Sequence, residues 1–166
     1  MKTAKGFTLI ELLVVISIIG ILATLVAANL NSARSRARDA ERKSDLKNVE
    51  TAMRLYFNDK GVYPASDGSG NILGCGLNGT SICTWGSPWV TGGNTCSDMG
   101  VTCYMQSLPS DPLPGQNYKY ELGSGGDTFI MTACLENASD AQGITTVGTS
   151  YNSLCSTSHW MFQIKQ

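Results

Sequence analysis

A long apolar run near the amino terminus constrains the fold of this chain more than any other feature. It extends from Leu12 to Ala28, and an acidic residue, Glu11, stands at its start. A run of this kind is long enough to cross a bilayer as a helix. An ionised carboxylate in hydrocarbon costs about 2.5 kcal/mol or more, so we expect Glu11 to have a partner.

The remainder of the chain changes character at Lys60. Eight of the twelve Lys and Arg residues lie between Asn31 and Lys60, whereas all six cysteines and all five prolines follow Lys60. The overall net charge of −1 gives no bias toward nucleic acid. We therefore expect a basic helical half followed by a cysteine-rich globular half.

Six cysteines after a membrane-length segment indicate an oxidising compartment and disulfide bonds. A zinc site is disfavoured because the chain has no C-x-x-C pair and its one histidine is not near a cysteine pair. Closure of short loops costs the least chain entropy, so near neighbours are the expected partners. This argument predicts the pairs Cys75–Cys83, Cys96–Cys103 and Cys134–Cys155.

Residues 30–60 contain neither proline nor glycine and carry an apolar face at spacings of three and four. That face consists of Leu46, Val49, Met53 and Phe57, and Ala33, Ala37 and Ala40 continue it upstream. Asp39–Lys43 and Glu50–Arg54 have the spacing of helix-stabilising ion pairs. Gly61 and Pro64 then predict a stop, so we expect one helix over residues 7–60, membrane-spanning over 7–29 and amphipathic over 30–60.

Three segments after residue 116 alternate apolar and polar residues, which predicts strands at 117–122, 128–135 and 159–165. A glycine-rich turn at 123–126 joins the first two into a hairpin. The expected fold class is α+β: a long N-terminal helix packed on a small antiparallel sheet. Residues 67–100 are interpreted as a long loop stapled by the first two disulfides, and Trp85 and Trp89 as a small core beneath it or as exposed adhesive aromatics.

The segment Lys5-Gly6-Phe7-Thr8-Leu9-Ile10-Glu11, after a short basic leader and before an aliphatic helix, resembles the processing site of type IV prepilins and type II secretion pseudopilins. The resemblance implies the pilin fold. It also implies that prepilin peptidase cuts between Gly6 and Phe7 and methylates the new amino group of Phe7. Glu11 would pair with that amine on a neighbouring subunit. The chain would then comprise a leader (1–6), a helix (7–60) and a globular head (61–166).

The same resemblance implies a function: a pilin that assembles as a helical homo-oligomer through its N-terminal helix, for adhesion, motility or DNA uptake. Its partners would be the peptidase, an inner-membrane assembly platform and, before assembly, the membrane. The precursor would span the inner membrane once with a cytoplasmic N-terminus. The product would be an extracellular filament or a periplasmic pseudopilus.

Several alternatives stay open. The chain could be a major pseudopilin of a type II secretion system, or an exported, membrane-anchored binding module that never polymerises. Its N-terminal segment could instead be a signal peptide cut after Ala28, or an uncut anchor. The basic residues from Arg34 to Lys43 could form a solvated helix surface, contact acidic faces of neighbouring subunits, or bind anionic lipid.

The sequence does not favour an enzyme, a cofactor or a specific nucleic-acid partner. The one histidine, His159, lies in a predicted strand, and no glycine-rich phosphate loop follows a strand. The related major pseudopilins bind calcium through acids just after the strand that corresponds to 128–135. Here Cys134 and Leu135 occupy much of that stretch, so Asp127, Glu136 and Asp140 are weak candidates and no metal is expected.

Overall fold

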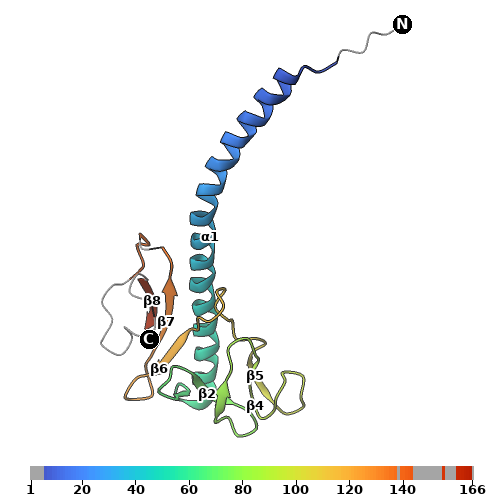
Figure 1. Ribbon diagram of the computed structural model, residues 1–166. Coiled ribbons are helices and arrows are strands. Elements are labelled where there is room, and N and C mark those ends of the chain that lie inside the picture. Colours follow the sequence, from blue (N-terminus) through green and yellow to red (C-terminus); the bar gives the residue numbers. More distant parts are fainter. Residues whose placement is uncertain (1–5, 138, 144–154, 156–159, 166) are drawn as a thin grey trace. The chain divides into compact units, whose positions relative to one another are not determined.

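The computed structural model describes residues 6–137, 139–143, 155 and 160–165, apart from the side chains of residues 25–29 and Trp160 (Figure 1). The chain forms two compact units, Met1–Ala37 and Arg38–Gln166. We call them the N-terminal unit and the globular unit and describe each separately. The helix α1 contributes its first part to one unit and its second part to the other.

Helix α1 comprises Leu9–Lys60, so the expected helix over residues 7–60 is confirmed to within two residues at its start. A reciprocal cap begins it: the Glu11 amide donates to the Thr8 Oγ1 atom, and the Thr8 amide donates to the Glu11 carboxylate. At the other end, Gly61 has a positive φ of 74° and donates its amide to the Phe57 carbonyl. Such a left-handed residue ends a helix, and glycine adopts it without strain.

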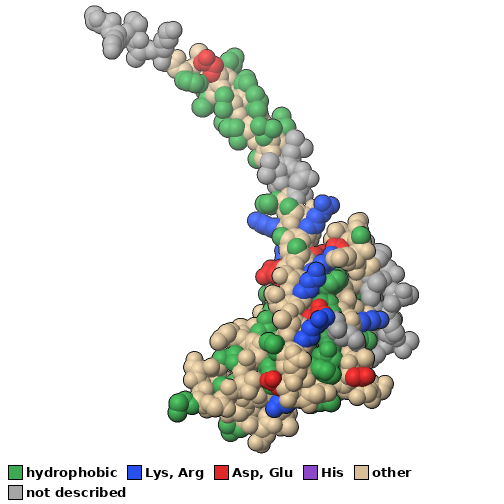
Figure 2. Space-filling model, turned by 180° about the vertical axis from the view of Figure 1, so that it is seen from behind, with side chains coloured by type: hydrophobic (Ala, Val, Ile, Leu, Met, Phe, Trp, Pro, Cys, Tyr) green, Lys and Arg blue, Asp and Glu red, His purple; other side chains and the backbone are tan. Residues whose placement is uncertain are grey.

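In the N-terminal unit, the large apolar side chains from Phe7 to Leu22 are exposed all around the helix. Figure 2 shows them as a continuous apolar surface on the face in view. Among the residues that the structure describes, no helix is both long enough and apolar enough to cross a membrane.

Three strands of the globular unit lie where the alternation predicted them. They are β6 (Lys119–Leu122), β7 (Phe129–Leu135) and β8 (Trp160–Lys165). They form an antiparallel sheet in the order β6-β7-β8, with Tyr120 opposite Met131 and Ala133 opposite Phe162. The predicted glycine-rich hairpin joins β6 to β7, with the Gly123 amide donating to the Thr128 carbonyl.

The interpretation of residues 67–100 as a loop is wrong, because this stretch contains strands of two small sheets. The first sheet has the antiparallel order β1-β2-β3, from β1 (Ala65–Ser66), β2 (Ile72–Cys75) and β3 (Ser81–Cys83). The second pairs β4 (Trp89–Thr91) with β5 (Thr102–Met105). These strands have two to four residues and show no regular alternation of apolar and polar residues, so their composition resembled a loop.

Three disulfides fasten these elements, and they join the pairs that loop closure favours. Cys75–Cys83 links β2 to β3, Cys96–Cys103 ties the β4–β5 connection to β5, and Cys134–Cys155 ties β7 to the following segment. Most of the polar excursion between Cys134 and Cys155 lies outside the described residues, as does His159.

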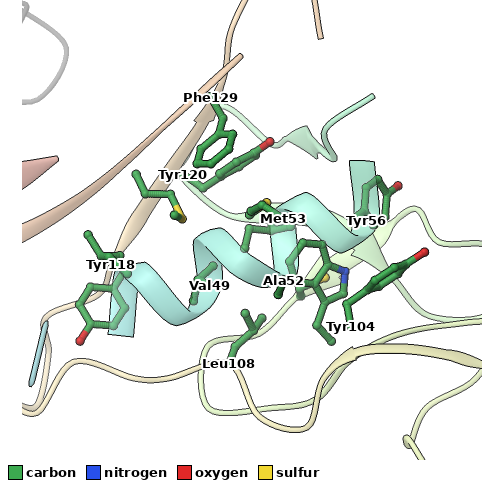
Figure 3. Close-up of a cluster of buried hydrophobic side chains, with 14 of the residues drawn as sticks. Val49, Ala52, Met53, Tyr56, Tyr104, Leu108, Tyr118, Tyr120 and Phe129 are labelled. Carbon is green, nitrogen blue, oxygen red and sulfur yellow. The ribbon is translucent and has the colours of Figure 1, made fainter. Parts of the chain in front are cut away.

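The predicted apolar face of α1 forms the centre of the core. Leu46, Val49 and Met53 are fully buried and Phe57 is partly buried, whereas Ala33, Ala37 and Ala40 are exposed. Figure 3 shows Tyr120 and Phe129 on one side of the helix and Tyr104 and Leu108 on the other. Trp89 is fully buried and Trp85 packs against the core, so the core interpretation of these tryptophans is confirmed.

Candidate processing and assembly site

The expected processing site lies just outside the helix. Gly6, Phe7 and Thr8 precede the first helical residue, and Phe7 is 82% exposed. A peptidase needs an accessible, non-helical backbone, and exposed segments of this kind are preferred cleavage sites. The Gly6–Phe7 bond therefore has the local conformation that the predicted cut requires.

Glu11 lies in the first turn of α1, where the positive end of the helix dipole favours a carboxylate. One oxygen of its carboxylate, Oε2, accepts hydrogen bonds from the Thr8 amide (2.9 Å) and the Thr8 hydroxyl (2.7 Å). Among the described residues, no cationic group is paired with Glu11. The exposed carboxylate is thus oriented by Thr8 and available to a cation from outside this chain.

A second charged site lies in the globular unit, and the sequence did not predict that its residues form one cluster. The guanidinium of Arg42 is fully buried and forms two parallel 2.8 Å hydrogen bonds with Asp111. Its third nitrogen donates to Asp39 and to Glu136, both at 2.8 Å. Burial alone would lower the pKa of Arg42, but its hydrogen bonds to the carboxylates outweigh that effect and raise it. We call Arg38, Asp39, Arg42, Asp111 and Glu136 the Arg42 cluster.

The Arg42 cluster also satisfies backbone groups. The Asp39 carboxylate accepts the amides of Glu136 and Asn137, and Asp111 accepts the amide of Leu113. It therefore joins α1 to the segment before β6 and to the end of β7. A buried charge is tolerated only when it is paired and hydrogen-bonded, and these carboxylates meet both conditions.

Two of the three weak calcium candidates, Glu136 and Asp140, are engaged with basic side chains. Glu136 binds Arg38 as well as Arg42, and its hydrogen bond from Arg38 lowers the pKa of Glu136 to about 2. Asp140 pairs with Lys43 at 2.5 Å, and this hydrogen bond lowers the pKa of Asp140. Within the described part of the chain, no group of three acidic, cysteine or histidine residues could hold a metal ion.

These contacts revise the expectations for the basic residues of the helix. Arg38, Arg42 and Lys43 bind acids of the same chain, so they do not form a wholly solvated surface. The expected Asp39–Lys43 pair is wrong, since Asp39 pairs with Arg42, one position earlier. The Glu50–Arg54 pair is confirmed at 2.8 Å. The sequence held a local signal for only one of these contacts, since Asp39 precedes Arg42 by three residues.

Comparison with known proteins bears on the N-terminal site and on the family of the chain. The family described as the prokaryotic N-terminal methylation motif matches residues 1–27. The type II secretion system core protein G of Aeromonas hydrophila is 32% identical over 133 residues, which covers 75% of this chain and 84% of that protein.

Two pilins are similar over shorter stretches. The type IV wide pilus major component PilA4 of Thermus thermophilus is 40% identical over 80 residues, which covers 48% of this chain and 60% of that protein. The type IV major pilin protein PilA of Myxococcus xanthus is 42% identical over 59 residues, covering 36% of this chain and 27% of that protein. No solved structure matches the chain significantly.

Proposed function

The chain belongs to the family of type IV pilins and type II secretion pseudopilins, and on that premise we propose that it is a structural subunit that polymerises through its N-terminal helix into a filament. One observation carries the proposal. The N-terminal unit exposes its apolar side chains around the whole helix and presents a single oriented carboxylate at the start. An apolar surface of this extent requires a membrane or other protein around it.

In this proposal the precursor is anchored in the inner membrane by residues 7–29, with its N-terminus in the cytoplasm. Prepilin peptidase removes residues 1–6 and methylates Phe7, and an inner-membrane platform transfers the subunit to a surface or periplasmic filament. Cleavage creates an amine at Phe7, and Glu11 of a neighbouring subunit binds it. The relatives are named as pilus and secretion components, which supports a structural role.

The pairing of Glu11 with an amine explains how its charge is tolerated. An unpaired charge within a packed bundle of helices would be expensive, whereas an ion pair with good geometry offsets most of that cost. The carboxylate would then favour one axial position of each subunit relative to the next. Thr8 already holds the carboxylate in place in the free chain.

Substitution of Glu11 tests the proposal. We expect Glu11→Ala to abolish or severely reduce filaments seen by electron microscopy, while carbonate-resistant membrane association and leader removal persist. Intact mass of the processed chain should show loss of residues 1–6 and gain of one methyl group. Glu41→Ala, an exposed acid elsewhere on α1, is the matched control and should assemble normally. Normal filaments from Glu11→Ala would refute the assembly role, and an uncut chain would favour the anchored binding module.

A second candidate, a major pseudopilin of a type II secretion system, is favoured by one comparison. At 32% identity, a type II secretion core protein aligns over 84% of its own length, whereas the two pilins align over 60% and 27% of theirs. Deletion of the gene separates the candidates. Loss of surface filaments with intact protein secretion supports the pilin, and loss of secretion with intact surface filaments supports the pseudopilin.

A further inference from the structure

A polar pocket of about 430 Å³ lies in the globular unit at the C-terminal end of α1. It is enclosed by the last turns of the helix, the β2–β3 turn and the β4–β5 sheet. The side chains that matter for its chemistry are Tyr56, Lys60, Leu77, Asn78, Thr91 and Thr102. Its volume falls within the range of sites that bind small molecules.

Glycines keep this pocket open. Gly79, Gly92 and Gly100 all lie in its wall, and each has a positive φ. A side chain at Gly100 would meet no other atom within 4 Å. The positive φ at these three positions favours glycine, so no side chain projects from them.

Hydroxyl groups gather along one wall. The β4–β5 register puts Thr91 opposite Thr102, and Tyr104 follows Thr102 by two residues on the same face of β5. Tyr104 is only 7% exposed and does not line the pocket itself, and its hydroxyl lies near Thr91 and Asp59. Figure 3 shows the hydroxyls of Tyr56 and Tyr104 directed to the same side, away from the core. The hydroxyl groups that this wall offers to a ligand are those of Thr91 and Thr102, the two threonines in the lining.

The charge of the pocket is positive. Lys60 is the one charged residue in its lining, and Lys60 forms no ion pair with the described residues. Asp59 lies close to Tyr104 but does not line the pocket. The Tyr56 ring and Leu77, which is 72% exposed, add apolar contact surface. A complementary ligand is small, rich in hydroxyls, partly apolar on one face and negatively charged.

We propose that this pocket binds an acidic sugar, a pyranose ring that carries one carboxylate. Lys60 pairs with the carboxylate, Asn78 and the threonine hydroxyls bind the ring hydroxyls, and the C–H face of the ring lies against Tyr56 and Leu77. The site goes beyond the proposed structural role, and binding does not require assembly.

Binding is tested on the full processed chain in detergent, so that failure to form filaments leaves the measurement intact. The probes are glucuronate, glucose and acetate, measured by saturation-transfer NMR and isothermal titration. We expect glucuronate to bind more tightly than glucose by about tenfold, the contribution of one charge-assisted hydrogen bond. Acetate, which lacks the ring, should bind more weakly than either.

Two variants localise the site. Lys60→Gln should remove the preference for glucuronate over glucose, and Asn78→Ala should weaken both sugars. Lys47→Gln, an exposed lysine outside the pocket, should change neither. Equal unfolding midpoints for all variants show that each is folded. The proposal is overturned if glucuronate shows no saturable binding, if acetate binds as tightly as glucuronate, or if Lys60→Gln and Lys47→Gln behave alike.

Discussion

Arg42 joins three parts of the chain through one side chain. Its guanidinium binds Asp39 one turn earlier in α1, Asp111 before β6 and Glu136 after β7. A buried ion pair often stabilises no better than a well-packed apolar group would. Removal of one partner is a different case, because the remaining charges are then left buried and unpaired. Loss of Arg42 should therefore cost more free energy than its ion pairs contribute relative to apolar side chains.

Arg42→Met should therefore be strongly destabilising. Asp39 and Asp111 are 2% and 1% exposed, so neither can be solvated when the guanidinium is lost. We expect a loss of about 3–5 kcal/mol in the free energy of unfolding, measured by urea denaturation of the full chain in detergent. Arg54→Met is the matched control, since Arg54 is 58% exposed. Its exposed pair is worth only about 0.2–0.5 kcal/mol. Similar midpoints for the two variants would contradict the role assigned to the cluster.

The Arg42 cluster also predicts how stability depends on pH. The pKa of Glu136 is lowered from 4.5 to about 2, chiefly by the hydrogen bond from Arg38. Its stabilising contribution is fully present above pH 4.5 and is lost as the pH falls through the folded-state pKa near 2. Urea midpoints should thus decline between these values. Glu136→Gln should flatten that part of the profile, and an unchanged profile would show that other carboxylates dominate it.

The contacts of Glu11 within the chain are local, whereas those of Arg42 are mostly distant, which is why the sequence did not predict the Arg42 cluster. The bonds that orient Glu11 come from Thr8, three residues away, so a local pattern contains them. The partners of Arg42 include acids 69 and 94 positions away. No local pattern distinguishes an arginine with such partners from one on a solvated surface.

Helices and strands were likewise predictable where their signal is local in the sequence. The buried face of α1 was predictable because its period of 3.6 recurs over several turns, and the strands β6 to β8 because each lies in a segment that alternates apolar and polar residues. The strands β1 to β5 show no such alternation, although disulfides fix β2 to β3 and β5 to its preceding loop, and Trp89 of β4 packs on Tyr56 of the helix. Their positions depend on the finished fold more than on their own residues.

Along α1, the cost of truncating a leucine should depend on the face. Leu46 is fully buried, so Leu46→Ala should cost about 2–5 kcal/mol in unfolding free energy. Leu55 lies on the same helix but is 50% exposed, and Leu55→Ala should cost well under half as much. Chemical denaturation of the two variants side by side measures the difference. Equal losses of unfolding free energy in the two variants would contradict the assignment of Leu46 to the buried face of the helix.

At the scale of the whole molecule, the chain consists of two units that share one helix. Residues before Arg38 belong to the N-terminal unit, although the helix continues without a break. A helix without tertiary packing has only marginal stability in water. The part of α1 before Arg38 therefore has only marginal stability in water, and in detergent the exposed polar turns just before Arg38 are open to proteases.

Limited proteolysis should reveal this boundary. We expect trypsin to cut the detergent-solubilised chain early at Arg34 or Arg36, both exposed, and to leave the buried Arg42 intact. Mass spectrometry should then detect a resistant fragment that starts between residues 35 and 37 and retains the three disulfides. An earlier cut within the globular unit, at Lys119 for example, would argue against a boundary between the two units just before Arg38.

The position of the Arg42 cluster in the chain has a mechanical consequence for a subunit in a filament under tension. A pull transmitted along α1 from Ala37 reaches Arg38, Asp39 and Arg42 before it reaches the aromatic core. Their bonds to Asp111 and Glu136 link this part of the helix to two other segments of backbone. In a filament of this chain, the Arg42 cluster would thus bear part of the tension before it reaches the hydrophobic core of the globular unit.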